Sequence, residues 1–242
     1  MSTHQPPELV LVHSPLTGPG TWQPVAEVLR QHGRKVSLPS LTTALTAGGP
    51  YYPALVSAAA GQARLGEQGA PVVLVGHSGA GPLLPALARS AARARTVAGT
   101  VYADAQLPHP GRSWLEEAPP ELAEQIAGLA AGGQLPPWNT WFPADVIAHE
   151  LPDPAVRDRF LAEIPRVPLA YLGERAPEAA TDPDHARTAY LRLSGQYEAM
   201  AVRAEANGHR VLRRTSHHLG LVTDPEGTAV ALEKLADGFP PA

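Results

Sequence analysis

The run Val72-Val-Leu-Val-Gly76-His77-Ser78-Gly79-Ala80-Gly81 decides the fold of this chain. Its apolar, β-branched beginning predicts a buried strand, and the following Pro82-Leu-Leu-Pro-Ala-Leu-Ala88 predicts a helix. A serine on such a sharp strand-to-helix turn has a strained backbone, and the residues two before and two after it must be small so that strand and helix can approach each other. Gly76 and Ala80 meet this requirement. We therefore expect Ser78 to be an exposed nucleophile.

Strand-like and helix-like segments alternate on both sides of this turn. Short apolar runs predict six strands, at 8–13, 34–38, 72–75, 97–102, 167–172 and 209–213. Helical patterns fill the gaps between them, at 22–33, 51–69, 79–93, about 185–207 and 225–237. Strands separated by helices predict an α/β fold, with a doubly wound, mainly parallel six-stranded sheet and helices on both faces.

One long segment, 105–166, interrupts this alternation. It exceeds an ordinary connection between a strand and a helix, and structureless loops of such length are uncommon in compact domains. Helical patterns within it predict a small helical cap inserted after the fourth strand, with 1–104 and 167–242 forming the core of a single domain. Trp138, Trp141 and Phe142 either fasten the cap to the core or line an apolar substrate pocket beneath it.

Composition limits the classes of function. The 242 residues carry a net charge of -4 with dispersed signs, which gives no electrostatic footprint for nucleic acid or anionic lipid. We expect a small-molecule substrate, no nucleic-acid or membrane partner, and a monomer or homodimer. No cysteine is present, and no histidine pair has the spacing of a metal-binding helix, so we expect no metal and no other cofactor. The first residues lack a signal-peptide or membrane-span pattern, which predicts a cytoplasmic protein.

The same turn has a second interpretation as a dinucleotide-binding motif. Gly76-x-Ser78-x-x-Gly81 follows a strand, and Asp104 stands near the end of the next strand, where a ribose-binding acid would lie. However, the unit is third in the predicted sheet instead of first. In addition, Lys35 and Lys234 are the only lysines, and neither follows a tyrosine at the spacing of a short-chain dehydrogenase. The sequence therefore favours the nucleophile.

Three regions together resemble the α/β-hydrolase superfamily, especially its compact bacterial members. Besides the turn, Val12-His13-Ser14-Pro15 stands where the family has His-Gly-x after the first strand, and Gly18-Pro-Gly-Thr-Trp22 matches the glycine-rich stretch before a helix. The turn here is Gly-x-Ser-x-Ala instead of Gly-x-Ser-x-Gly, which preserves its steric requirement. The resemblance implies an esterase-like serine hydrolase with a triad in the order serine, acid, histidine, and it places His13, Ser14 and Pro15 at the substrate site.

The resemblance also indicates the general base. In the family, a histidine lies shortly before a Pro-Glu that begins the last helix, and here 216–226 reads Ser-His217-His218-Leu-Gly-Leu-Val-Thr-Asp-Pro225-Glu. The family histidine usually stands seven residues before that proline, which favours His218 and leaves His217 as the alternative. A neutral imidazole takes the serine proton, and a carboxylate holds it in the correct tautomer.

The acid requires a choice between two positions. In most family members it follows the strand usually numbered seventh, in a pattern like Gly-Glu-Arg-Asp-Pro, but here 173–177 reads Gly-Glu174-Arg-Ala176-Pro. Some relatives carry the acid after the preceding strand, where this chain has Tyr102-Ala-Asp104-Ala. We predict that Asp104 is the acid, with Glu174 as the alternative.

The oxyanion site departs from the family pattern. The N–H of Gly79 is one expected donor, but the second falls at Pro15, which has no N–H. Either Leu16 or a neighbouring amide replaces it, or the chemistry differs from ester hydrolysis. We therefore predict a serine hydrolase that acts through an acyl-enzyme on a small, neutral or hydrophobic ester, thioester, lactone or amide. Two alternatives stay open, namely a lyase or eliminase using Ser78 and His218 for proton transfer, and a catalytically inactive small-molecule-binding protein.

Overall fold

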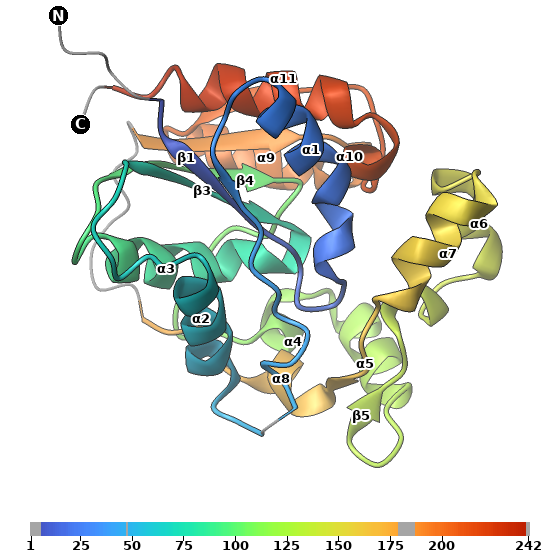
Figure 1. Ribbon diagram of the computed structural model, residues 1–242. Coiled ribbons are helices and arrows are strands. Elements are labelled where there is room, and N and C mark those ends of the chain that lie inside the picture. Colours follow the sequence, from blue (N-terminus) through green and yellow to red (C-terminus); the bar gives the residue numbers. More distant parts are fainter. Residues whose placement is uncertain (1–5, 47, 179–186, 241–242) are drawn as a thin grey trace, which may run out of the picture.

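The computed structural model describes residues 6–46, 48–178 and 187–240, and its centre is one parallel sheet (Figure 1). The strand order is β2-β1-β3-β4-β7-β8, and every neighbouring pair is parallel. These six strands are β1 (Glu8–Val12), β2 (Val36–Ser37), β3 (Val72–His77), β4 (Val97–Ala103), β7 (Thr188–Arg192) and β8 (Arg210–Arg213). The predicted α/β class and the six-stranded, mainly parallel sheet are confirmed.

The fifth strand of this sheet is not the one predicted. The predicted strand over 167–172 is wrong, because only β6 (Val167–Pro168) is extended there, and it pairs antiparallel with β5 (Gln134–Leu135) in a separate sheet. Pro168 has no N–H for a strand ladder, and α8 (Leu169–Gly173) begins directly after it. The strand beside β4 is instead β7, in a region predicted to be helical, about 185–207.

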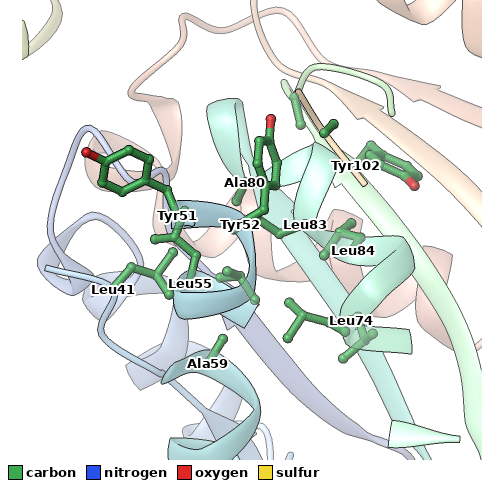
Figure 2. Packing of buried hydrophobic residues seen from close by; sticks show 14 of the residues in the cluster. Leu41, Tyr51, Tyr52, Leu55, Ala59, Leu74, Ala80, Leu83, Leu84 and Tyr102 are labelled. Carbon is green, nitrogen blue, oxygen red and sulfur yellow. The ribbon is translucent and has the colours of Figure 1, made fainter. Parts of the chain in front are cut away.

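Helices cover both faces of the sheet (Figure 1). On one face, α1 (Gln23–Gln31) and α11 (Pro225–Ala236) pack on one set of alternating strand residues, which includes Leu9 and Val73. On the other face lie α2 (Tyr51–Gln62), α3 (Leu84–Ala91) and α9 (Glu198–Ala206). Every residue of β3 is buried. Because neighbouring residues of a strand point to opposite faces, the sheet is covered on both faces at β3. Figure 2 shows how Ala80, Leu83 and Leu84, just after β3, pack beside Tyr52 of α2.

We call the segment between β4 and β7 the cap; its described part is longer than the predicted insertion, 105–166. Its described residues contain β5, β6 and α8 as well as four further helices and one 3-10 turn. These are α4 (Trp114–Glu117), α5 (Pro120–Gly128), η3 (Trp138–Thr140), α6 (Ala144–Glu150) and α7 (Pro154–Ala162). In Figure 1 the pair α6 and α7 stands to one side of the sheet. Within the described residues, no helix is long and apolar enough to cross a membrane.

Two carboxylates join the pair α6 and α7 to loops of the core. Glu150, at the end of α6, accepts a hydrogen bond from the N–H of Leu219 at 3.3 Å. Glu163, just after α7, accepts one from the N–H of Gly20 at 2.7 Å, in the 3-10 turn η1 (Pro19–Thr21). A small apolar cluster around Leu151, Phe160 and Leu219 lies between these attachments. The pair α6 and α7 therefore contacts the core at the loops that follow β1 and β8.

Candidate active site

Ser78 lies on a strained turn at the carboxyl end of β3. Its φ is 55°, in the left-handed region, which costs a residue with a side chain roughly 1–2 kcal/mol. The turn continues as the 3-10 helix η2 (Ser78–Leu83) and then as α3. A Cβ at Gly76 would lie 3.1 Å from the Leu84 side chain, and one at Gly81 would lie 1.9 Å from the carbonyl oxygen of Gln106. Close packing on both sides thus explains the small residues that flank Ser78.

Asp104 is fully buried one residue beyond the end of β4. Its Oδ1 accepts the N–H of Leu193 at 2.6 Å, and both carboxylate oxygens accept the N–H of Ser194 at 3.1 Å. Oδ2 also accepts the Ser194 hydroxyl at 2.6 Å and faces Nδ1 of His218 at 3.2 Å. Hydrogen bonds from the end of β7 therefore hold this carboxylate against His218.

The His218 ring is the middle member of a stack of three rings. Tyr197 lies on one side, with centroids 4.9 Å apart and planes 5° apart, and the ring of His77 also stacks on it, at 4.5 Å and 28°. Nε2–H of His77 donates to the carbonyl oxygen of His218 at 3.1 Å. Burial, together with the neighbouring His218, holds the pKa of His77 well below its usual value, so His77 is neutral. With Nδ1–H directed at Asp104, the other nitrogen of His218, Nε2, is available as a base.

The Ser78 hydroxyl contacts Tyr197 in this structure. The distance from Ser78 Oγ to Tyr197 Oη is 3.5 Å, which is long for a hydrogen bond between two oxygens. Among the described residues, no hydrogen bond joins Ser78 Oγ to His218. Catalytic hydrogen bonds are often long or misaligned in a structure without substrate and tighten in the complex. The structure therefore brings Ser78, His218 and Asp104 to one edge of the sheet, with Ser78 Oγ directed at Tyr197.

Tyr197 is the residue of this site that sequence reasoning missed. It ends the 3-10 turn η5 (Gly195–Tyr197), which is separated from the end of β7 by two residues. Because 185–207 was predicted as one helix, Tyr197 carried no functional signal. A strand assignment for Thr188-Ala-Tyr-Leu-Arg192, with its threonine, tyrosine and leucine, would have placed the loop after it at the same sheet edge as Ser78.

The two alternative residues lie elsewhere. His217 has a side chain that is 36% exposed, and it contacts Thr223 Oγ1 at 2.9 Å and Glu150 at 3.5 Å. The Glu174 carboxylate accepts the N–H groups of Tyr51 and Tyr52 at 2.7 and 2.8 Å. It caps the first turn of α2, where a negative charge is favourable. Since 173–177 does not follow a strand of the main sheet, the basis for considering Glu174 as the acid is lost.

The expected oxyanion region is built from the loop after β1. The N–H of Leu16 donates to Ser14 Oγ at 3.2 Å, so the predicted donor is engaged by a side chain of its own loop. Ser14 Oγ in turn lies beside Gly79, since a Cβ at Gly79 would be 3.1 Å from it. Ser14 and Pro15 are both buried. These contacts bring Ser14 to the turn that carries Ser78.

His13 differs from the substrate-binding role predicted for it. Its ring is fully buried; Nδ1–H donates to the Ser14 carbonyl at 2.7 Å, and Nε2 accepts the N–H of Leu41 at 2.9 Å. Burial lowers the pKa of His13 to about 4, which keeps it neutral. With both nitrogens used inside the protein, His13 ties the loop after β1 to the segment after β2.

The three predicted aromatic residues of the cap have different surroundings. Trp138 approaches the site, with its ring 6.5 Å from that of His218. Trp141 is buried within the cap, and its indole N–H donates to the carbonyl of Pro136 at 2.9 Å. Phe142 is 38% exposed and packs edge-on against Trp138 at 5.7 Å. Trp138 is thus the cap side chain next to the candidate base.

Within the part of the chain that the structure describes, no group of three or more histidine, aspartate or glutamate side chains is arranged to hold a metal ion. A shallow surface hollow lies behind the turn, between η2, α3 and the segment after β4, and it contains none of Ser78, Asp104 or His218. Its lining is mainly proline and alanine, with Arg89 and His109 as the polar members.

Comparison with known proteins identifies the fold. No family model matches the chain, and no curated protein matches its sequence. Solved structures, in contrast, match over nearly the whole length. An extracellular α/β-hydrolase from a Paenibacillus species is 19% identical with a TM-score of 0.72, covering 95% of this chain and 99% of its own. Its printed description reports structural and functional homology to tobacco salicylic acid binding protein 2.

Two further structures agree with this result. A variant of tomato methylketone synthase I, complexed with beta-ketoheptanoate, is 14% identical with a TM-score of 0.73, covering 98% of this chain and 100% of its own. A pyrethroid hydrolase from Sphingobium faniae is 18% identical with a TM-score of 0.67, covering 96% of this chain and 97% of its own. At these identities the likeness shows the fold alone: the chain has the α/β-hydrolase fold.

Proposed function

We propose that this protein is a serine hydrolase with Ser78 as nucleophile, His218 as general base and Asp104 as the acid that orients it. One observation carries the proposal: Ser78, strained at φ 55°, shares a sheet edge with a histidine whose Nδ1 lies 3.2 Å from a fully buried carboxylate. A serine hydroxyl becomes a good nucleophile when a neutral imidazole takes its proton, and a carboxylate fixes the tautomer of that imidazole.

The proposed reaction proceeds in two halves. In the first, Nε2 of His218 takes the Ser78 proton while Oγ bonds to the acyl carbon, and the leaving group departs with that proton. In the second, His218 activates water, which attacks the acyl carbon and releases Ser78. A small shift of Ser78 Oγ that brings it within hydrogen-bond distance of His218 Nε2, with Tyr197 still beside it, completes the proton path. Asp104 stabilises the imidazolium formed in each half.

The negative oxygen of the tetrahedral intermediate requires donors. We assign one to the N–H of Gly79 and the second to the hydroxyl of Ser14, which replaces the N–H that Pro15 lacks. The contacts support this assignment, because Ser14 Oγ lies beside Gly79 and accepts the N–H of Leu16, which leaves its own proton free to donate. Removing one such donor typically lowers kcat by about 10²- to 10³-fold in serine hydrolases.

The substrate we propose is a small, neutral or hydrophobic ester, thioester, lactone or amide. Trp138 beside His218 supplies apolar surface at the site. By their descriptions, two of the similar structures handle apolar compounds: one is a pyrethroid hydrolase, and the other, tomato methylketone synthase I, is complexed with 2-tridecanone, an apolar ketone. A panel of nitrophenyl esters of increasing acyl length, measured for kcat/KM, would define the preferred chain.

A lyase is the second candidate, and one observation favours it. Neither Pro15 nor the engaged N–H of Leu16 offers the usual second backbone donor for an oxyanion. A lyase would use Ser78 and His218 for proton transfer without an acyl-enzyme. Turnover in water enriched in ¹⁸O separates the two, because a hydrolase places one labelled oxygen in the acid product and a lyase places none.

Covalent labelling by a fluorophosphonate tests the proposal directly. We expect the wild type to gain the mass of the phosphonyl group on Ser78, the Ser78→Ala variant to gain none, and Ser57→Ala, an exposed serine of α2, to label like the wild type. Absence of labelling in the wild type would exclude the hydrolase and favour a catalytically inactive binding protein.

A further inference from the structure

Tyr197 touches both partners of the proposed proton transfer. Its hydroxyl lies 3.5 Å from Ser78 Oγ, and its ring is stacked face to face on the imidazole of His218 at 4.9 Å. The stack is nearly parallel, with 5° between the planes. The loop after β7 serves both residues. The N–H groups of Leu193 and Ser194 hold Asp104, and Tyr197 lies three residues further along, at the end of η5.

We propose that Tyr197 is a further catalytic residue, whose hydroxyl donates to Ser78 Oγ as that atom gains negative charge and whose ring face stabilises the imidazolium of His218. The inference rests on the proposed hydrolase function. It assigns to one side chain the stabilisation of both charges that appear when the proton leaves Ser78.

Both contacts are stronger after the proton transfer than before it. A hydrogen bond to a neutral hydroxyl at 3.5 Å contributes little, whereas a bond to an oxygen with alkoxide character is shorter and stronger. A neutral imidazole gains little from an aromatic face, whereas a cation is attracted to it. Interactions that strengthen only in the transition state raise kcat, so this arrangement accelerates the chemical step.

The phenol has the protonation state that this role requires. Burial raises the pKa of Tyr197 to about 12; the hydrogen bond to Ser78 lowers it, and a smaller effect of the Asp104 charge raises it. At neutral pH Tyr197 is therefore a donor. The opposite face of His218 is covered by neutral His77, Nδ1 faces Asp104, and the Trp138 ring lies 6.5 Å away between centroids, so of the groups named here only Asp104 carries a charge.

The two parts of the proposal are separable by substitution. Tyr197→Phe keeps the ring stack and removes the hydroxyl; Tyr197→Leu removes both. We expect the phenylalanine variant to lose about 10- to 100-fold in the rate of fluorophosphonate labelling, with KM for an ester substrate little changed. We expect the leucine variant to lose about a further 2- to 30-fold. Tyr51→Phe, whose ring packs on Tyr171, is the matched control and should label at the wild-type rate.

In the labelling reaction, the Ser78 proton passes to His218, Oγ bonds to phosphorus, and fluoride leaves. Its rate constant measures the nucleophilicity of Ser78 without a contribution from product release. Circular dichroism and melting temperature must stay near wild type for the phenylalanine variant, which separates the role from a merely structural one.

The possible outcomes separate this inference from the proposed hydrolase function on which it rests. If the wild type does not label, the hydrolase proposal fails and Tyr197 has no such role. If the wild type labels and Tyr197→Phe labels equally fast, the inference alone is overturned. Faster labelling of Tyr197→Phe would also overturn it, because the hydroxyl would then restrain Ser78 instead of assisting it.

Discussion

Replacing Asp104 by asparagine removes a charge with almost no change in shape. The left-handed backbone at this position, with φ 42°, suits asparagine as well as aspartate. Oδ1 can remain the acceptor for the N–H groups of Leu193 and Ser194. The amide nitrogen then replaces Oδ2 opposite Nδ1 of His218. A donor there forces the proton of His218 onto Nε2, the nitrogen that must accept the Ser78 proton.

The expected loss follows from these contacts. The wrong tautomer should lower kcat by at least ~10²-fold, which corresponds to about 2.7 kcal/mol of lost transition-state stabilisation. The variant also loses the hydrogen bonds that the Ser194 N–H and hydroxyl donate to Oδ2, so its free energy of unfolding should fall by roughly 1–3 kcal/mol. Ester hydrolysis should therefore be measured at a temperature where circular dichroism shows the variant folded.

Ser194→Ala is the matched control for this experiment. It removes the hydroxyl 2.6 Å from Oδ2 but keeps the carboxylate and its contact with His218. We expect a comparable loss of stability with less than about a tenfold change in kcat. If folded Asp104→Asn turned over as fast as Ser194→Ala, the carboxylate would not orient the base, and the assignment of the acid would be refuted.

Three further predictions concern the other residues. His218→Ala should be as inactive as Ser78→Ala in an ester assay. His217→Ala should keep measurable turnover, because the His217 side chain contacts Thr223 and Glu150 and not Asp104. The reverse order of activities would reassign the base. Ser78→Gly should be inactive but about 1 kcal/mol more stable than Ser78→Ala, since glycine adopts a φ of 55° without strain, and equal urea midpoints would contradict this. Glu174→Gln should lower the free energy of unfolding by about 1–2 kcal/mol, because it weakens the hydrogen bonds to the first N–H groups of α2, and should change kcat by less than about tenfold. A variant that is inactive but as stable as the wild type would argue against this structural role.

The strand and turn around Ser78 could be predicted from sequence because their signals are local. The apolar run 72–75 predicts the buried strand. The small residues on either side of Ser78 predict the close packing of strand and helix, which the structure shows where Gly76 approaches Leu84. The placement of Asp104 next to His218 also followed, since it depends on the end of a strand that was correctly assigned.

The region from 167 to 206 could not be assigned correctly, and the reason is physical. Val167-Pro-Leu-Ala-Tyr-Leu172 is as apolar as a strand, but its apolar side chains belong to a short helix that packs on α2 through Tyr171. Thr188–Arg192 is only five residues long and precedes a strongly helical run, so periodicity alone merges it with α9. These residues form a strand because they pair with β4, which is distant in the sequence, and a local pattern cannot show this contact. The error placed Glu174 near the site and left Tyr197 unnoticed.

The two carboxylates that join the cap to the core suggest where substrate range can be altered by design. Glu150 and Glu163 hold the ends of the helical pair on the loops that carry His218 and follow β1. Phe142 and Val146, both exposed, lie away from these attachments at the start of α6. A library restricted to these two positions would reshape the outer surface of the cap while the base keeps its support, so variants selected for new substrates should retain the melting temperature of the parent.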